Sequence, residues 1–237
     1  MGKKKVSVIL PTYNEKENIE ELIRQVYHYT GKDLFEVIVV DDNSSDGTSK
    51  IVENLQKKNK NLRLVRRLHK TGLASAIWRG INESKGNIVV WLDCDLSHPP
   101  KIIPKLLENL PQYDVVIASR YVNDGKDERS FVRALASKSV NLLAYAFLGL
   151  KVKDLTSGFY AVKKEVFSQV TLMTTGHAEY CIRFPYESLK KGFKIKEVSY
   201  VFSDRKKGKS KTTSSLSNFL YYGYLCGKEI IKLSVGK

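Results

Sequence analysis

The sequence predicts an α/β fold in which a mostly parallel central sheet is flanked by helices. Its strands are near-continuous apolar runs, typical of strands buried on both faces, and they alternate with amphipathic helical segments. Two of these runs lead directly into acidic clusters, Asp41-Asp42 and Asp93-Cys94-Asp95. Open α/β sheets bind ligands beyond the carboxyl ends of their strands. A ligand site is therefore expected along that edge of the sheet.

The first half of the chain alternates regularly between strands and helices. Apolar runs predict strands over Lys5–Leu10, Val37–Val40, Leu62–Val65 and Ile88–Leu92. Helical periodicity between them groups Ile19, Leu22, Ile23 and Val26, then Ile51, Val52 and Leu55, and finally the segment Leu73–Ile81. Asn14 and Glu17 are spaced like a capping box, so the first helix is expected to begin near Asn14.

The pattern is less regular beyond Pro99. Further strands are expected over Val115–Ala118, Phe159–Val162 and Lys194–Phe202, and helices over Ile102–Leu110, Val132–Leu150 and Glu179–Leu189. The polar stretch Asn123–Ser130 has the composition of a mobile loop. The tail, Leu216–Val235, is aromatic and amphipathic. No repeat or linker interrupts the chain, so one domain is expected, with residues 1–211 as its body and 212–237 as a helical tail.

Charge and length limit the classes of partner. The 237 residues carry a formal net charge of +15, which attracts nucleic acid, anionic lipid and phosphorylated substrates alike. Part of this charge lies in Lys3-Lys4-Lys5, where a solvated surface run is equally consistent. The best candidate for a membrane span, Thr212–Gly227, has only 16 residues, so no span is expected. The three cysteines lack metal-ligand spacing and are expected to be free thiols.

The carboxylate pair Asp93 and Asp95 is the sharpest chemical signal. Side chains two positions apart on an extended strand point to the same side, and such carboxylates repel one another unless a cation lies between them. A Mg²⁺ or Mn²⁺ ion held there would neutralise a departing diphosphate. Solvated loop acids, or caps for the helix after Pro99, are the alternative.

Two further strand tips carry candidate binding groups. Asp41 follows the second strand, where an acidic residue accepts hydrogen bonds from a ribose or a base. Asp46 is expected to cap the next helix. Pro11, Tyr13 and Glu15 follow the first strand, where Tyr13 can stack on a base and Glu15 can bind a sugar or base. Alone, this segment is equally consistent with a turn into a helix.

Basic residues in the second half indicate phosphate binding. A basic, glycine-containing loop carries Arg205, Gly208, Ser210 and Lys211. Arginine forks onto phosphate oxygens, lysine adds a point charge, and glycine lets the backbone approach a ligand. Arg120 and Arg133 bracket the polar stretch, and structural salt bridges explain them nearly as well. His98 neighbours the carboxylate pair but is equally consistent with a helix start.

Six motifs taken together resemble family 2 glycosyltransferases of the Rossmann-like GT-A fold. They are, in chain order, Val8–Glu15, Val40–Gly47, Asp93–Pro100, Ser119–Tyr121, Ser157–Phe159 and Arg205–Lys211. Within that family the chain looks like a dolichyl-phosphate (polyprenyl-phosphate) mannosyltransferase, and the resemblance runs from about Val6 to Lys211. It implies a metal-dependent, inverting enzyme that moves mannose from GDP-mannose to a polyprenyl phosphate.

The resemblance also implies a role for each motif. The guanosine would be held by Pro11, Tyr13, Glu15 and Asp41. The metal ion, Mg²⁺ or Mn²⁺, and the nucleotide sugar would be bound by Asp93 and Asp95. Donor diphosphate and acceptor phosphate would be bound by Arg120, Arg133, Arg205 and Lys211. The acceptor and sugar region would be lined by Ser157, Gly158, Phe159 and Ser210. Catalysis would depend most on Asp95, Arg205 and Lys211.

Three positions depart from the family pattern. Ser97 stands where some relatives have a Gln that binds the metal, so water or a weaker hydroxyl contact would replace it. Lys209 stands where Glu is common and adds positive charge to the basic loop. The segment His177–Tyr180 does not match the mannosyltransferases closely, which leaves the identities of the sugar and of the acceptor open.

The implied acceptor, a lipid monophosphate, is already anionic and requires no strong general base. A lipid acceptor implies a cytoplasmic protein that is peripheral on the cytosolic face of a membrane. A small anchor subunit is compatible with this location. One interfacial surface is expected from Val140, Leu142, Leu143, Tyr145, Phe147 and Leu148. A second is expected from Phe219, Leu220, Tyr221, Tyr222, Tyr224 and Leu225, with Lys228 and Lys232 near the headgroups. Packing of both helices on the sheet is the alternative.

Other functions remain compatible with these residues. The same fold could use UDP-glucose or UDP-GlcNAc as donor, or a saccharide acceptor, for which Glu179 is the candidate catalytic carboxylate. A nucleotide-sugar binder without activity is also compatible with the fold, although the intact acidic pair disfavours it. Nucleic acid is not expected as a partner, because acidic strand tips repel phosphate and no recognition helix or aromatic RNA motif is present.

Overall fold

The computed structural model describes residues 3–68, 72–173, 175, 176, 178–205 and 216–236. Its central element is a seven-stranded sheet with the order β3-β2-β1-β4-β7-β5-β8. The strands are β1 (Val6–Thr12), β2 (Leu34–Asp41), β3 (Leu62–Arg66), β4 (Ile88–Trp91), β5 (Val115–Ser119), β7 (Tyr160–Lys163) and β8 (Ile195–Ser199). Only β7 runs antiparallel to its neighbours. The prediction of a mostly parallel sheet is confirmed.

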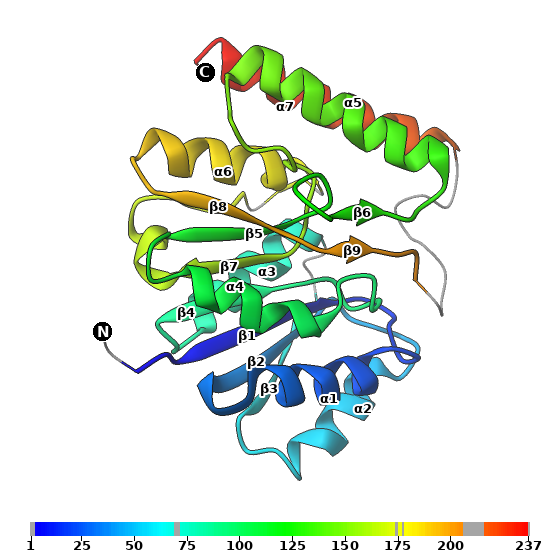
Figure 1. Cartoon of the computed structure of the whole chain (residues 1–237). Coiled ribbons are helices and arrows are strands. Elements are labelled where there is room, and N and C mark those ends of the chain that lie inside the picture. The colour runs from blue at the N-terminus through cyan, green and yellow to red at the C-terminus, as the bar shows by residue number, and fades with distance from the viewer. Residues whose placement is uncertain (1–2, 69–71, 174, 177, 206–215, 237) are drawn as a thin grey trace.

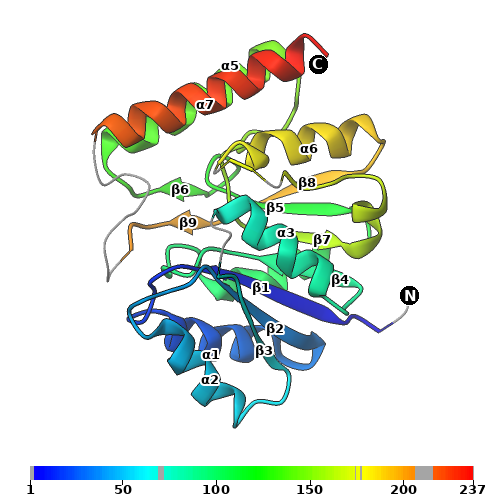
Figure 2. The same cartoon turned by 180° about the vertical axis from the view of Figure 1, so that it is seen from behind.

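Helices cover both faces of this sheet (Figures 1 and 2). The helices are α1 (Ile19–Thr30), α2 (Thr48–Gln56), α3 (Leu73–Glu83), α4 (Ile103–Asn109), α5 (Phe131–Leu148), α6 (Tyr180–Lys190) and α7 (Leu216–Ser234). Short 3₁₀ turns lie at η1 (Gly31–Asp33), η2 (Pro100–Ile102) and η3 (Lys164–Ser168). One apolar core lies between the sheet and α1, α2 and α4, and a second lies between the sheet and α3 and α6. Alternate strand side chains fill the two cores, as buried parallel strands require.

The helices α5 and α7 lie side by side across the β8 end of the molecule, beyond α6 (Figures 1 and 2). The carboxyl-terminal half of α7 is fixed to α6. Glu229 pairs with Arg183 at 2.5 Å, and the Tyr186 hydroxyl donates to the carbonyl of Leu233 at 3.0 Å. By contrast, α5 buries only Asn141 and Ala144. This pair of helices is therefore attached to the domain but leaves much apolar surface exposed.

Three details of the sequence prediction are wrong. The first helix begins at Ile19, because Asn14 adopts a left-handed conformation (φ 52°) and its side-chain oxygen accepts from the Ser45 amide instead of capping a helix. The strand expected over 194–202 divides into β8 and β9 (Val201–Phe202). The polar stretch contains β6 (Lys126–Asp127), which pairs with β9 in a separate two-stranded sheet.

The structure adds a candidate membrane span to the segment Thr212–Gly227 that the sequence analysis considered. Among the described residues, α5 is long and apolar enough to span a membrane by length and composition, with a mean hydropathy of 1.2 over its 18 residues. Only 11% of that helix is buried. Length and composition alone do not distinguish a spanning helix from one that lies on a surface.

Candidate active site

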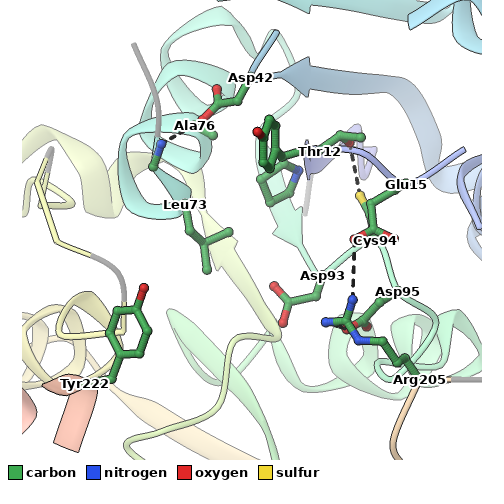
Figure 3. Close-up of a pocket in the computed structure, with 13 residues that line it drawn as sticks. Thr12, Glu15, Asp42, Leu73, Ala76, Asp93, Cys94, Asp95, Arg205 and Tyr222 are labelled. Carbon is green, nitrogen blue, oxygen red and sulfur yellow. Dashed lines mark hydrogen bonds and ion pairs between the residues drawn. The ribbon is translucent and has the colours of Figure 1, made fainter. Parts of the chain in front are cut away.

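The carboxyl ends of β1, β2 and β4 meet around a cavity of about 420 Å³, which we call the first cavity. Its walls combine strand-tip residues with groups from distant elements (Figure 3). The strand tips contribute Pro11, Thr12, Tyr13, Glu15, Asp42, Asp93, Cys94 and Asp95. Other elements contribute Gly72, Leu73, Ala76, Arg205 and Tyr222. The predicted ligand site is thus a real depression at the expected edge of the sheet.

A second cavity of about 460 Å³ adjoins the first, and the two share Leu73, Asp93 and Arg205. Three arginines line the second cavity in addition to Arg205, namely Arg120, Arg129 and Arg133. Carboxylates therefore dominate one cavity and guanidinium groups the other. Asp93 and Arg205 stand at their junction.

Asp95 is held firmly between two neighbours. Its Oδ1 atom accepts hydrogen bonds from the Ser97 amide at 3.0 Å and from the Ser97 hydroxyl at 2.5 Å. Its Oδ2 atom lies 2.8 Å from Nη2 of Arg205 (Figure 3). Arg205 also approaches Glu15, with 3.7 Å between Nη1 and Oε1. The guanidinium is thus a counter-charge inside the carboxylate cluster.

Asp93 has a different environment. Its carboxylate points into the cavity (Figure 3), and among the described residues it forms no ion pair with a lysine or arginine. Burial, followed by the nearby charges of Asp95 and Glu15, raises the pKa of Asp93 to about 7, although Arg205 opposes the shift. The described protein groups therefore stabilise the ionised form of this carboxylate poorly.

His98 is a structural residue of this site. Its Nδ1 atom accepts a hydrogen bond from the Asp93 amide at 3.1 Å, and its ring is buried among Phe159, Tyr200 and Phe202. Burial lowers the pKa of His98 to about 4. The imidazole is therefore neutral near pH 7, and it holds the turn that carries the acidic pair.

The acidic pair after β2 is arranged differently from the sequence prediction. Asp41 is fully buried and accepts hydrogen bonds from Ser44 and from the Ser49 hydroxyl, the latter at 2.7 Å. It does not line the first cavity, whereas Asp42 does. Asp42 accepts from Arg67 and from the Gly72 amide, the latter at 2.7 Å. The predicted contact between Asp41 and a ligand therefore has no support in this geometry.

Other residues at the strand tips lie as expected. Pro11, Tyr13 and Glu15 all line the first cavity. Tyr13 is exposed, while Glu15 is buried and accepts from the Asn18 amide group at 2.9 Å. Asp46 accepts from the first amide of α2, that of Thr48, at 3.0 Å, although the N-cap position itself is Gly47.

The predicted arginines have unequal positions. Arg120 is buried and donates to Asp154 at 2.8 and 2.6 Å and to the Thr156 hydroxyl at 2.5 Å. Its donors are used within the protein, so the prediction that it binds phosphate is not supported. Arg133 is better placed, since it lines the second cavity and pairs with the exposed Asp204 at 3.0 Å. Arg205 lies at the junction, whereas Ser210 and Lys211 lie outside the described residues.

The segment after Thr156 shapes the second cavity. Ser157 and Gly158 line it, while Phe159 is buried in the core behind it. A Cβ atom on Gly158 would lie 3.2 Å from Cε1 of His98, 3.4 Å from the Tyr180 hydroxyl and 3.6 Å from Oδ2 of Asp93. Glycine at this position therefore keeps open the space between the acidic pair and the arginines.

Several lining residues were missed by the sequence analysis. Arg129 lines the second cavity and pairs with Asp127 at 2.6 Å. Tyr180, from α6, contributes a buried hydroxyl that has no hydrogen-bond partner among the described residues. Tyr222 of α7 reaches the first cavity (Figure 3). No local sequence pattern predicts that these residues line the cavities, because each comes from an element far from the strand tips in sequence. Glu179 lines neither cavity, and it accepts from the Ala178 amide at 2.9 Å.

The fold and the acidic strand tips define a glycosyltransferase of the GT-A class. Residues 7–171 match the model of glycosyl transferase family 2, and the chain belongs to this family. A solved structure of similar fold is glucosyl-3-phosphoglycerate synthase from Mycobacterium tuberculosis in complex with Mn²⁺, UDP and glucosyl-3-phosphoglycerate. The TM-score is 0.74 at 21% identity, over 97% of this chain and 79% of that chain. At that identity the likeness concerns the fold alone.

Three curated relatives are closer in sequence. The chain is 40% identical over 213 residues to the dolichol-phosphate mannosyltransferase of Pyrococcus furiosus, covering 87% of this chain and 59% of the relative. It is 32% identical over 216 residues to the polyprenol monophosphomannose synthase of Mycolicibacterium smegmatis, covering 88% and 81%. It is 34% identical over 165 residues to the dolichol-phosphate mannosyltransferase of Saccharomyces cerevisiae, covering 67% and 61%. The chain thus spans about three-fifths of the length of the first and third.

Proposed function

We propose that this chain moves mannose from GDP-mannose to a polyprenyl phosphate at a membrane surface, with inversion at the sugar and with the help of a divalent cation. The observation that carries the proposal is the junction of a carboxylate-rich cavity with an arginine-rich cavity at Asp93 and Arg205. A nucleotide sugar and an anionic acceptor require such a pair of neighbouring sites. The names of the three relatives support mannose and a polyprenyl phosphate as substrates.

The acidic pair fits a hard cation such as Mg²⁺ or Mn²⁺. The raised pKa of Asp93, caused first by burial and then by Asp95, indicates that the protein alone stabilises the ionised carboxylate poorly, and a bound cation would stabilise it. Among the described residues no three His, Cys, Asp or Glu side chains form a ready-made metal site. This agrees with an ion that keeps several waters and binds one or two carboxylates together with substrate phosphates. When bound, it would stabilise the charge on the leaving diphosphate.

Structural neighbours of the same fold were solved with Mn²⁺ or with Mg²⁺, which is consistent with a divalent cation at the strand tips. In this chain Asp95 would bind the cation through its Oδ2 atom, because the amide and hydroxyl of Ser97 already donate hydrogen bonds to Oδ1. Arg205 now occupies that oxygen. It would therefore leave Asp95 and turn its donors to phosphate oxygens when the substrates bind.

The guanosine would occupy the first cavity. Tyr13 is exposed there and can stack on a base, and Glu15 and Asp42 present acceptor atoms along the wall. In this proposal Asp41 acts indirectly, since its carboxylate fixes the loop through Ser44 and Ser49. GDP as the nucleotide rests on the sequence resemblance.

The acceptor phosphate would occupy the second cavity. Arg129, Arg133 and Arg205 line it, and each is paired with a carboxylate that a phosphate group can displace. A phosphate acceptor is anionic before it reacts, so the neutral His98 need not remove a proton. A saccharide acceptor would require a carboxylate base, and Glu179 lines neither cavity. These observations favour a lipid phosphate over a saccharide.

The membrane surface would be provided by α5 and α7. Four of the α5 residues predicted at the interface are exposed: Leu142, Leu143, Tyr145 and Phe147. Val140 and Leu148 instead pack partly against the core, so that part of the prediction needs correction. On α7 the exposed apolar residues include Tyr221, Tyr224 and Ile231. The predicted contributions of Phe219 and Leu220 lie outside the described side chains.

These helices also reach the reaction centre. Tyr222 of α7 lines the first cavity, and Arg133 of α5 lines the second. A lipid phosphate held at this surface would thus lie next to both cavities. We place the enzyme on the cytosolic face, where nucleotide sugars are available, and an anchor subunit would be compatible with the exposed surface of α5.

The alternative keeps the fold and changes the ligands to a UDP-sugar or a saccharide acceptor. The structural neighbours with UDP motivate it, but their identity to this chain supports only the fold. Calorimetry with Mn²⁺ and each of GDP-mannose, UDP-glucose and UDP-GlcNAc distinguishes the donors. We expect binding of GDP-mannose alone, followed by formation of a lipid-linked mannose when a polyprenyl phosphate is added. Binding of a UDP-sugar alone would reject the proposed donor.

A further inference from the structure

A third cavity, of about 980 Å³, lies outside the proposed reaction centre. It is bounded by the connection from β5 to β6, by one side of α5 and by the segment that follows α5 (Figure 1). Four lysines line it: Lys126, Lys138, Lys151 and Lys153. Of the described residues predicted to bind the donor or the metal, Arg120 alone lines it, and Arg120 donates to Asp154 and Thr156 instead. The charge of this cavity therefore needs a separate explanation.

The four ammonium groups are exposed, and no carboxylate among the described residues forms an ion pair with any of them. Lys138 lies over the Tyr121 ring, with 6.0 Å from Nζ to the ring centroid. Two acids also line the cavity. Asp127 is engaged by Arg129 and Arg120, which leaves Glu128 as the one acid opposite four lysines. The cavity thus has an excess of positive charge that favours an anion.

One wall of this cavity is apolar and continues onto the exposed side of α5. Leu142 and Tyr145 line the cavity, yet they remain 68% and 61% exposed. Phe147, one turn from Leu143, extends the exposed apolar surface along the same helix. Lysines next to exposed leucine and aromatic side chains are the combination found where a protein contacts headgroups and the acyl boundary together.

We propose that this cavity binds the headgroup of an anionic membrane phospholipid and thereby fixes the orientation of the enzyme on the membrane. The inference rests on the proposed membrane location and assigns it a site. The headgroup would lie among the four lysines, while Leu142 and Tyr145 contact the lipid beside it. This site is separate from that of the acceptor phosphate. Arg120 lies between the second and third cavities, and its buried ion pair with Asp154 keeps it there as a wall between them.

The test replaces all four cavity lysines with glutamine: Lys126→Gln, Lys138→Gln, Lys151→Gln and Lys153→Gln. A matched control changes four exposed lysines near α2, at the opposite end of the molecule (Figure 1): Lys32→Gln, Lys57→Gln, Lys58→Gln and Lys60→Gln. Both variants lose the same charge. Sedimentation is measured with vesicles of phosphatidylcholine containing phosphatidylglycerol and with vesicles of phosphatidylcholine alone, without donor or acceptor.

Each basic residue at an anionic surface contributes roughly a factor of five to partitioning. For four lysines we therefore expect the cavity variant to bind the phosphatidylglycerol vesicles on the order of 600-fold more weakly, whereas the control variant binds like the wild type. Unchanged binding of the cavity variant, or an equal loss in the control, would overturn the inference. Inorganic phosphate is added to the wild type with the phosphatidylglycerol vesicles as a further test. If it abolishes vesicle binding, the inference is overturned, because the lysines would then form a site for free phosphate.

A second readout separates this site from the reaction centre. Mannose transfer from GDP-mannose to a short-chain, water-soluble polyprenyl phosphate should be the same in the cavity variant and the wild type. A parallel loss of this transfer would assign the lysines to the acceptor and reject a separate site. If neither protein transfers mannose but only the cavity variant loses vesicle binding, the proposed function fails while the headgroup site stands.

Discussion

At the scale of single residues, Arg205 is the residue for which we infer different contacts with and without bound substrates. Its guanidinium lies 2.8 Å from Asp95 and 3.7 Å from Glu15, in the space that a metal ion and diphosphate would share. A positive group there lowers the repulsion among the acidic side chains while substrates are absent. We infer that metal and Arg205 compete for Oδ2 of Asp95.

The variant Arg205→Ala tests this competition. Turnover should fall by at least about 100-fold, because a donor to phosphate oxygens is lost. Mn²⁺ binding without nucleotide should become stronger, since the competing guanidinium is gone. Calorimetry with Mn²⁺ measures the second effect, and Arg24→Ala, which removes an exposed ion pair on α1, is the control. Weaker Mn²⁺ binding by Arg205→Ala would contradict this role.

Gly158 provides a second test at the scale of one residue. A methyl group there would contact His98 and the Tyr180 hydroxyl and approach Asp93. We expect Gly158→Ala to lower kcat by up to about 100-fold through misplacement of the reacting groups, with little change in GDP binding. Gly227→Ala, whose Cβ would meet open space, is the control for steady-state kinetics. Unaltered kcat in Gly158→Ala would reject this account of the glycine.

The sequence indicated some of these residues and not others. Asp93 and Asp95 were predictable because they immediately follow a buried strand. The choice between Asp41 and Asp42 was not, because adjacent side chains face opposite sides and only the register against β1 and β3 decides which one faces the cavity. Arg129 and Tyr222 reach the cavities through tertiary packing, which no local pattern encodes.

Among the elements, α5 and β5 are linked through one buried ion pair, that of Arg120 and Asp154. Arg120, directly after β5, donates to Asp154 and Thr156, and Thr156 in turn contacts Ser137 and Asn141 of α5. Burial opposes ionisation of Asp154, but the charge and hydrogen bonds of Arg120 leave the pKa of Asp154 below its usual value. This network therefore attaches α5 to the edge of the sheet.

Asp154→Asn should be strongly destabilising, because it removes the nearest charge partner of a buried guanidinium and leaves Asp127 at 3.5 Å. A loss of about 3–5 kcal/mol in the free energy of unfolding is expected, measured by urea denaturation. The depressed pKa means that Asp154 stabilises the wild type fully above its unfolded pKa of about 3.9, and that this stabilisation is lost as the pH falls through the folded value. The difference between variant and wild type should therefore shrink below about pH 4. A constant difference down to the lowest pH would contradict the assignment.

Elements were predicted well where periodicity is strong and less well where pairing is distant. The apolar runs located β1, β2, β4 and β5 because each strand is buried on both faces. The strand β6 and the separation of β9 from β8 were missed, because the pairing of β6 with β9 joins segments about 75 positions apart and neither strand is long enough to show a period. The start of α1 was misplaced because Asn14 tolerates the left-handed conformation that its turn requires.

For the molecule as a whole, the positions of the charged and apolar side chains say more about the class of partner than the net charge does. The sheet brings acidic strand tips to one edge, and α5 and α7 carry exposed apolar side chains past the same region (Figures 1 and 2). The formal charge of +15 is compatible with several anionic partners. Arginines and lysines line different cavities, and on this basis we propose separate sites for an acceptor phosphate and a lipid headgroup.

The most direct test of the central claim is mannose transfer from GDP-mannose to a polyprenyl phosphate by the wild type and by Asp95→Asn, in the presence of Mn²⁺. Asp124→Asn, at an exposed position, serves as the matched control. We predict transfer by the wild type and the control, and a loss of at least about 100-fold in Asp95→Asn with the fold intact, because the leaving diphosphate loses its main stabilisation. Near-normal transfer by Asp95→Asn would contradict the assigned role of the acidic pair, and absence of lipid-linked mannose with the wild type would contradict the proposed reaction.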